Sequence, residues 1–176
     1  TTRVGHVVGL YLRSPISPQQ PLDYTIEAIH DQGGLVIAVH PLALRVKGIG
    51  IEAITSVINH PSPDVYFDGF EVYNAGLDIY PPLRDKNAEA LALYQELLID
   101  YADKIGAAVG SSDSHFYPIG AGRTWYNGDL REALARRETI VTSGYTGGKF
   151  EGLNAAYREF GPKAFDRYWE LKKRNL

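Results

Sequence analysis

Short apolar runs alternate with longer helical stretches along this chain, and that alternation constrains the fold more than any other feature of the sequence. The apolar runs predict strands at residues 7–12, 35–39, 67–73, 107–110 and 140–142. The stretches between them predict helices at residues 22–32, 50–59, 87–104 and 130–137. A strand and a helix repeated every roughly 30 to 40 residues predict right-handed βαβ units and therefore a parallel sheet.

The length of the chain limits which parallel α/β architecture is possible. At 176 residues the chain is too short for a complete eight-unit barrel, which needs about 250 residues. No segment resembles an interdomain linker, so residues 1–176 are expected to form a single domain that ends in a helical tail at 153–176. A doubly wound sheet and part of a barrel both remain open at this point.

Composition excludes several classes of function. The net charge of −3 gives no sign of a surface for nucleic acid or anionic membrane. No apolar run approaches about 18 residues and no leader-like segment is present, so we expect a protein of the cytoplasm without a membrane span. The chain has no Cys, and any transition-metal site must therefore use His and carboxylates.

Three polar residues directly follow predicted strands, where ligand sites in parallel α/β folds lie. His40 follows the run at 35–39, and Asp113 and His115 follow the run at 107–110 in the segment GSSDSH. A spacing of two puts the Asp113 and His115 side chains on one face of an extended backbone. This pair suits a half-site for Zn, Mn or Fe, and it equally suits an Asp-capped turn with an exposed His.

Other polar residues are candidates through their place near strand ends. Glu71 and Asn74 end the third strand, where they can bind a ligand or orient one. Arg123 and Arg45 have the planar donor group that suits phosphate, and surface ion pairs are the alternative for both. His6 stands before its apolar run rather than after it, which from the sequence favours a core or edge histidine. His30 and His60 are expected to be solvated.

Taken together and in order, these segments resemble the polymerase-and-histidinol-phosphatase (PHP) domain family. The resemblance rests on GHVVGLYL, IEAIHDQGGLVIAVHP, DGFEVYN, GSSDSHF and IGAGRT, and it covers roughly residues 5 to 142. It implies the C-terminal portion of a distorted (β/α)7 barrel with two or three divalent metal ions at its C-terminal mouth. The implied activity is metal-dependent hydrolysis of a small phosphorylated substrate.

The resemblance also implies roles for particular residues. His6, His40, Asp113 and His115 match metal ligands of the family, with Asp113 and His115 also catalytic, and Arg123, Arg45, Asn74 and Glu71 are expected to contact substrate. The HxH strand and the bridging Glu that open the family's pattern have no counterpart here. We therefore expect the first three βα units to come from a missing N-terminal segment of the same protein, with a separate chain as the alternative.

Two other functions remain open from the sequence. A non-catalytic domain could use the same residues to bind a metal or a phosphorylated ligand. A metallohydrolase that acts on amide bonds is also compatible with them.

Overall fold

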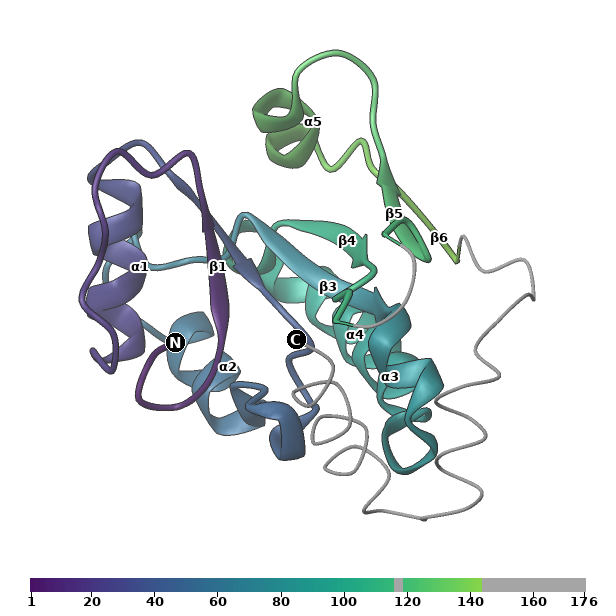
Figure 1. The fold of residues 1–176 in the computed structure, drawn as a ribbon. Helices are drawn as coiled ribbons and strands as arrows, with labels where there is room; N and C mark the ends of the chain where they lie inside the picture. The colour runs from purple at the N-terminus through teal and green to yellow at the C-terminus, as the bar shows by residue number, and fades with distance from the viewer. Residues whose placement is uncertain (116–118, 144–176) are drawn as a thin grey trace, which may run out of the picture.

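A four-stranded, mostly parallel sheet of βα units organises the protein, which is a mixed α/β structure. The computed structural model describes residues 1–115 and 119–143, so the expected tail at 153–176 lies outside the described residues. The strands stand side by side in the order β1–β2–β3–β4 (Figure 1). Their bounds are β1 Val7–Leu10, β2 Leu35–Ala38, β3 Gly69–Asn74 and β4 Ala107–Ser111.

The first strand runs opposite to the other three, which differs from the all-parallel sheet that the βαβ pattern predicts. β1 pairs antiparallel with β2, so that Val7 lies opposite Ala38. The proline-containing loop after β1 is the cause, because it returns to the start of the chain before α1 (Leu22–His30) begins, with Gln19 N–H donating to the Thr1 carbonyl oxygen. α1 then leads back to the end of the sheet at which β1 finished.

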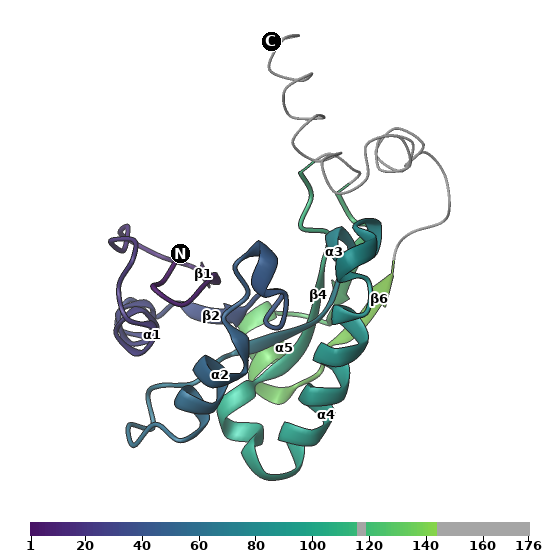
Figure 2. The same cartoon turned by 90° about the horizontal axis from the view of Figure 1, so that it is seen from below.

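One face of the sheet packs against helices. The helices are α1, α2 (Gly50–Ile58) and α4 (Lys86–Ile105), and Figure 2 shows α2 and α4 along this side. Ile26, Ile54 and Ile105 reach the sheet from these helices and are fully buried with Val36 and Phe70. Alternate residues of each strand therefore form the main core, as the period of two requires.

The opposite face of the sheet carries a second apolar cluster. Ile37 and Ala107 lie on this face, and Leu134 packs on them from α5 (Leu130–Arg136), with Leu130 beside it. The side chain of Asp129 caps α5 as expected, since its Oδ1 accepts from the N–H groups of Arg131 and Glu132. This face forms the floor of the candidate site.

Some short elements differ from the predicted pattern. The GAGRT segment, for which no strand was predicted, contains β5 (Gly122–Trp125), which pairs antiparallel with β6 (Ile140–Ser143) beyond β4. The short helix α3 (Ala75–Ile79) and the 3-10 turns η1 (Leu44–Val46) and η2 (Pro81–Leu83) are too brief to leave a periodic pattern. No helix among the described residues has both the length and the apolar character to cross a membrane.

Candidate functional site

A cavity of about 540 Å³ lies over the face of the sheet that packs against α5, which we call the inner face. Its floor is apolar and includes Ile37, Val39, Val109 and Leu134. Much of its polar lining comes from residues near the start of β1 and the carboxyl ends of β2, β3 and β4, and this part includes His6, His40, Glu71, Asn74, Ser111 and Asp113. The strand-end rule for parallel α/β folds thus describes where the polar residues of this cavity come from.

His40 lies two residues after the end of β2 and has an unusual backbone conformation. Its φ of 32° lies in the left-handed region, and its backbone N–H donates to Glu71 Oε2 at 2.5 Å. The side chain is only 6% exposed, and its Nδ1 has no hydrogen-bond partner within residues 1–115 and 119–143. A buried polar atom without a hydrogen bond raises the free energy of the folded state, so an ion or a water molecule bound at Nδ1 would stabilise this ring.

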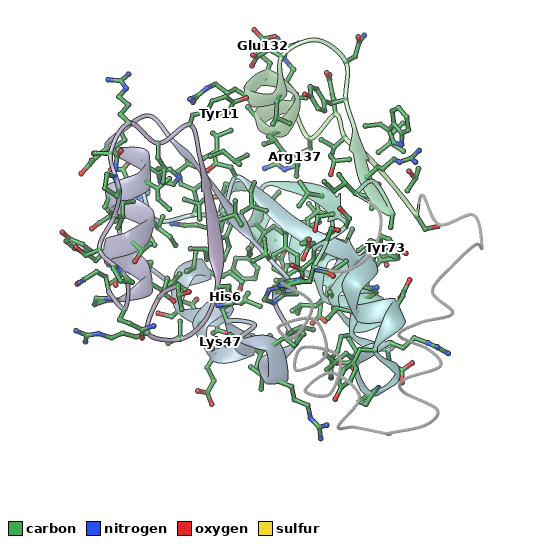
Figure 3. All side chains as sticks on the ribbon, viewed as in Figure 1. His6, Tyr11, Lys47, Tyr73, Glu132 and Arg137 are labelled. Atoms are coloured by element: carbon green, nitrogen blue, oxygen red, sulfur yellow. The ribbon has the colours of Figure 1, made fainter. Side chains whose placement is uncertain are left out.

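His6 reaches the same place because β1 is antiparallel. The start of β1 lies beside the end of β2, and the His6 backbone N–H donates to the Lys47 carbonyl oxygen at 2.8 Å. The His6 and His40 rings meet edge to face with centroids 5.5 Å apart. Figure 3 shows His6 and Lys47 at one end of the sheet, and Tyr11 and Arg137 at the other. The position before the apolar run therefore does not separate His6 from the strand ends.

The surroundings of His6 favour its neutral form. Burial lowers the pKa of His6, and the neighbouring His40, the N-terminus and Lys47 lower it further, against a smaller opposing effect of Asp113. A His pKa below its ordinary value leaves the imidazole neutral at neutral pH. Neutral imidazole is the state in which His ligates a metal ion.

Glu71 lies at the centre of the site. It is 2% exposed, and burial raises the pKa of its carboxyl group. Hydrogen bonds from Ser111, from Asn74 and from the His40 backbone oppose that rise. Ser111 was not among the predicted site residues, although its place in GSSDSH directly after a strand run was the signal that could have found it.

Asn74 connects the two carboxylates of the site. Its Nδ2 donates to Glu71 Oε2 at 3.0 Å and to Asp113 Oδ2 at 3.2 Å. Its Oδ1 accepts from the Leu77 N–H at 3.3 Å and caps α3, which fixes the orientation of the amide. Asn74 and Ser111 are register partners in the parallel pair of β3 and β4, and the segment after Ser111 carries Asp113 to this amide.

Asp113 and His115 occupy the loop after β4. Asp113 has a φ of 44°, again in the left-handed region, and lines the cavity. His115 turns back toward it, with Nδ1 2.8 Å from the Asp113 carbonyl oxygen and 3.7 Å from Asp113 Oδ1. The His115 side chain is 59% exposed and does not line the cavity. It stands at the rim beside Asp113.

The two arginines lie outside the cavity. Arg45 is exposed on η1 and is not part of the lining. Arg123 lies on β5, where its Nε donates to the Gly120 carbonyl oxygen at 2.7 Å. Arg123 lines a neighbouring groove with Ser111 and Ser112, so it adjoins the mouth through Ser111.

The other two histidines lie away from this site. His30 was expected to be solvated, but its ring is held between the Asp64 carbonyl oxygen at 2.7 Å and Asp68 Oδ2 at 3.0 Å. Asp68 precedes β3, so this pair is at the opposite end of the strand from the cavity. His60 Nδ1 accepts from the Ser62 N–H at 3.2 Å.

The donor types fit a divalent metal ion, but their number falls short. Two imidazoles and the carboxylates of Glu71 and Asp113 adjoin one mouth, and one imidazole nitrogen is buried without a partner in the described part of the chain. Nitrogen and oxygen donors suit Zn, Mn or Fe. As placed, however, the described residues contain no group of three or more His, Asp or Glu that could hold a metal ion. A catalytic zinc ordinarily has three protein ligands, so further ligands or a shift of these side chains would be required.

Comparisons with known proteins give one partial relative. An uncharacterized protein of Methanocaldococcus jannaschii is 36% identical over 74 residues, which are 42% of this chain. The match spans 38% of the length of that relative. No protein-family model matches the chain, and no solved structure matches it.

Proposed function

We propose that this chain is the C-terminal portion of a PHP-type (β/α)7 barrel and that it contributes to a metal-dependent phosphoesterase. The observation that carries the proposal is the meeting of His6, His40 and Asp113 at one mouth, with His40 Nδ1 buried and unpartnered among the described residues. Those three residues belong to different motifs of the family pattern and are more than 30 positions apart in the chain.

The residues of the mouth and of the adjoining groove have separate roles in this proposal. His6, His40 and Asp113 would hold the metal ions, and Asn74 would keep the Asp113 carboxylate in place. Two or three bound divalent ions (Zn, Mn or Fe) would supply positive charge for the phosphate and lower the pKa of a water molecule toward neutrality. Arg123 in the adjoining groove would contact the phosphoryl oxygens of a small phosphorylated substrate.

Proton transfer falls to the loop after β4. The water oxygen forms a bond to phosphorus while the bond from phosphorus to the ester oxygen breaks, and Asp113 accepts the proton of the water. Because His115 Nδ1–H would donate to the Asp113 carbonyl oxygen, the ring would have to be doubly protonated for Nε2–H to give its proton to the leaving ester oxygen, which leaves His115 neutral. The exposure of His115 at the rim is consistent with contact to a leaving group that departs to solvent.

Completion of the site needs either a shift of these side chains or further ligands, and we propose that ligands come from outside the described residues. The shortage of donors at the mouth supports a further segment of the same protein as the source, and the resemblance implies that this segment would be three N-terminal βα units with an HxH strand.

The same shortage of donors favours a second candidate function. A domain with too few ligands for a two-metal centre could bind a single metal ion or a phosphorylated ligand without turnover. This candidate shares the site but predicts binding with no hydrolysis.

The test uses the full gene product in which these residues occur, with p-nitrophenyl phosphate as substrate and Mn²⁺ or Zn²⁺ added. We expect metal-dependent turnover that falls at least about a hundredfold in His40→Ala and in Asp113→Ala. Arg45→Ala, which changes an exposed side chain outside the cavity, is the control and should stay within about twofold. Turnover that survives His40→Ala would reject the proposal, and metal binding without turnover would favour the second candidate.

A further inference from the structure

The side chain of Asn87, in the first turn of α4, makes hydrogen bonds to both the backbone N–H and the backbone carbonyl group of Asn74. Asn87 Oδ1 accepts from the Asn74 N–H at 2.9 Å, and Asn87 Nδ2 donates to the Asn74 carbonyl oxygen at 3.0 Å. A side-chain amide that makes both bonds does what a neighbouring strand would do, and it does so at the last residue of β3.

The orientation of the Asn87 amide is itself fixed by a second layer of bonds. Asn87 Nδ2 also donates to Asp78 Oδ1 at 2.8 Å, and Asp78 Oδ2 accepts from the Tyr73 hydroxyl at 2.7 Å. Nδ2 thus faces two acceptors and Oδ1 faces one donor, which leaves a single orientation for the amide. Partial burial of the phenol and the hydrogen bond to Asp78 raise the pKa of Tyr73, which keeps its hydroxyl a hydrogen-bond donor at ordinary pH.

These bonds end at the candidate site. The residue held by Asn87 is the one whose side chain donates to both Glu71 and Asp113. The pairing register between β3 and β4 shifts between Glu71 and Tyr73, so the strand ladder alone fixes the end of β3 less firmly than a regular strand end. Asn87 of α4 makes up for this by holding the backbone of Asn74 at the end of β3.

We propose that Asn87 is a positioning residue of the site: by clamping the backbone of Asn74 it sets the direction of the amide that spaces the Glu71 and Asp113 carboxylates. It touches neither substrate nor metal. Its consequence for metal affinity rests on the proposed function, whereas its hold on Asn74 does not.

The experiment compares three variants of the chain. Asn87→Ala removes both bonds to Asn74, and Asn87→Asp keeps the size but replaces the Nδ2 donor with an oxygen beside the Asp78 carboxylate. Tyr94→Phe is the matched control, because it removes a hydrogen bond of the same helix, from the Tyr94 hydroxyl to the Gly106 carbonyl oxygen at 3.1 Å, away from the site. Thermal unfolding by circular dichroism establishes that each variant is folded.

Two readouts decide the outcome. The side-chain amide signals of Asn74 in ¹⁵N NMR spectra should move and exchange faster with solvent in both Asn87 variants and stay unchanged in Tyr94→Phe. Affinity for Mn²⁺ should weaken about tenfold in the Asn87 variants and by less than twofold in the control.

Unchanged Asn74 amide signals in Asn87→Ala would overturn the proposal, and so would full Mn²⁺ affinity in Asn87→Asp, which a role in filling space predicts. If the wild-type chain binds no Mn²⁺, the proposed metal chemistry fails, and the Asn74 signals alone decide whether Asn87 orders this residue.

Discussion

Two residues at the mouth of the cavity have backbone angles that residues other than glycine rarely adopt. His40 has a φ of 32° and Asp113 a φ of 44°, and each lies two residues after the end of a strand of the four-stranded sheet. Such conformations cost on the order of 1–3 kcal/mol each and persist only where the surroundings fix them. Here hydrogen bonds to Glu71 and from Asn74 provide that fixation. The backbone conformation of these two candidate ligands therefore depends on other residues of the site.

His30 gives a residue-scale prediction about pH. Burial lowers the pKa of His30, but the hydrogen bonds to Asp68 and the Asp64 carbonyl oxygen raise it more, so the folded-state pKa lies above the ordinary value of 6.5. The protonated ring, with both nitrogens as donors, is therefore favoured in the folded state. Its contribution to stability is fully present below the unfolded pKa of about 6.5 and is lost as pH rises through the folded pKa.

Urea unfolding between pH 5 and pH 9 measures this effect as the difference in unfolding free energy between wild type and His30→Gln. The difference should be largest below pH 6.5 and should shrink as the pH rises. His60→Gln leaves the His30–Asp68 pair intact and should keep the wild-type trend. A difference that is constant with pH would show that the pair does not favour the protonated ring.

At the scale of elements, the turn between β2 and α2 places two candidate ligands. Gly48 packs so closely against this turn that a Cβ would fall on the His40 carbonyl oxygen and lie 2.8 Å from Ala43 N. The neighbouring Lys47 carbonyl oxygen accepts the His6 N–H. One tight turn therefore holds both His40 and the segment that carries His6.

Gly48→Ala tests the role of this turn. The added methyl group must displace backbone, so we expect a loss of about 1–3 kcal/mol in the free energy of unfolding together with weaker Mn²⁺ binding. Gly33→Ala is the control: a Cβ there has nothing within 4 Å, and its positive φ of 71° accounts for a loss of about 1 kcal/mol with unchanged Mn²⁺ affinity. Equal Mn²⁺ affinity in both variants would show that the turn does not position the metal-binding residues.

The sequence predicts the long elements well and the orientation of β1 poorly. Helices α1, α2, α4 and α5 and strands β2, β3 and β4 lie where periodicity and glycine or Asp punctuation predict them, because each buries a regular apolar pattern. The direction of β1 depends on the path of the loop after it, which carries no periodic signal. β5 was missed because glycine flanks it.

The candidate site divides in the same way. Strand ends predict the location of His40 and Asp113, since the carboxyl ends of parallel strands share one edge. His6 could be placed only through the family resemblance, because its position follows from the antiparallel β1. Asn87 lies on a helix far along the chain, and only tertiary contacts bring it to Asn74.

At the scale of the whole molecule, the inner face of the sheet is the apolar surface over which the candidate site lies. It is apolar along Val8, Ile37 and Val109, and among the described residues α5 and β5 contribute to its walls. The proposed N-terminal βα units would close this face and bring further ligands to the same mouth. The shortage of donors and the open apolar floor thus have one common explanation in the proposed account.

The central claim is that His6 and His40 bind a divalent metal ion, and the chain contains only five histidines with which to test it. The most direct measurement is a Mn²⁺ titration of the protein followed by ¹⁵N NMR of the imidazole side chains, in which a nearby paramagnetic ion broadens signals. The account predicts that the signals of His6, His40 and His115 broaden first, while those of His30 and His60 persist. Broadening of His30 or His60 with His6 and His40 unaffected would contradict it.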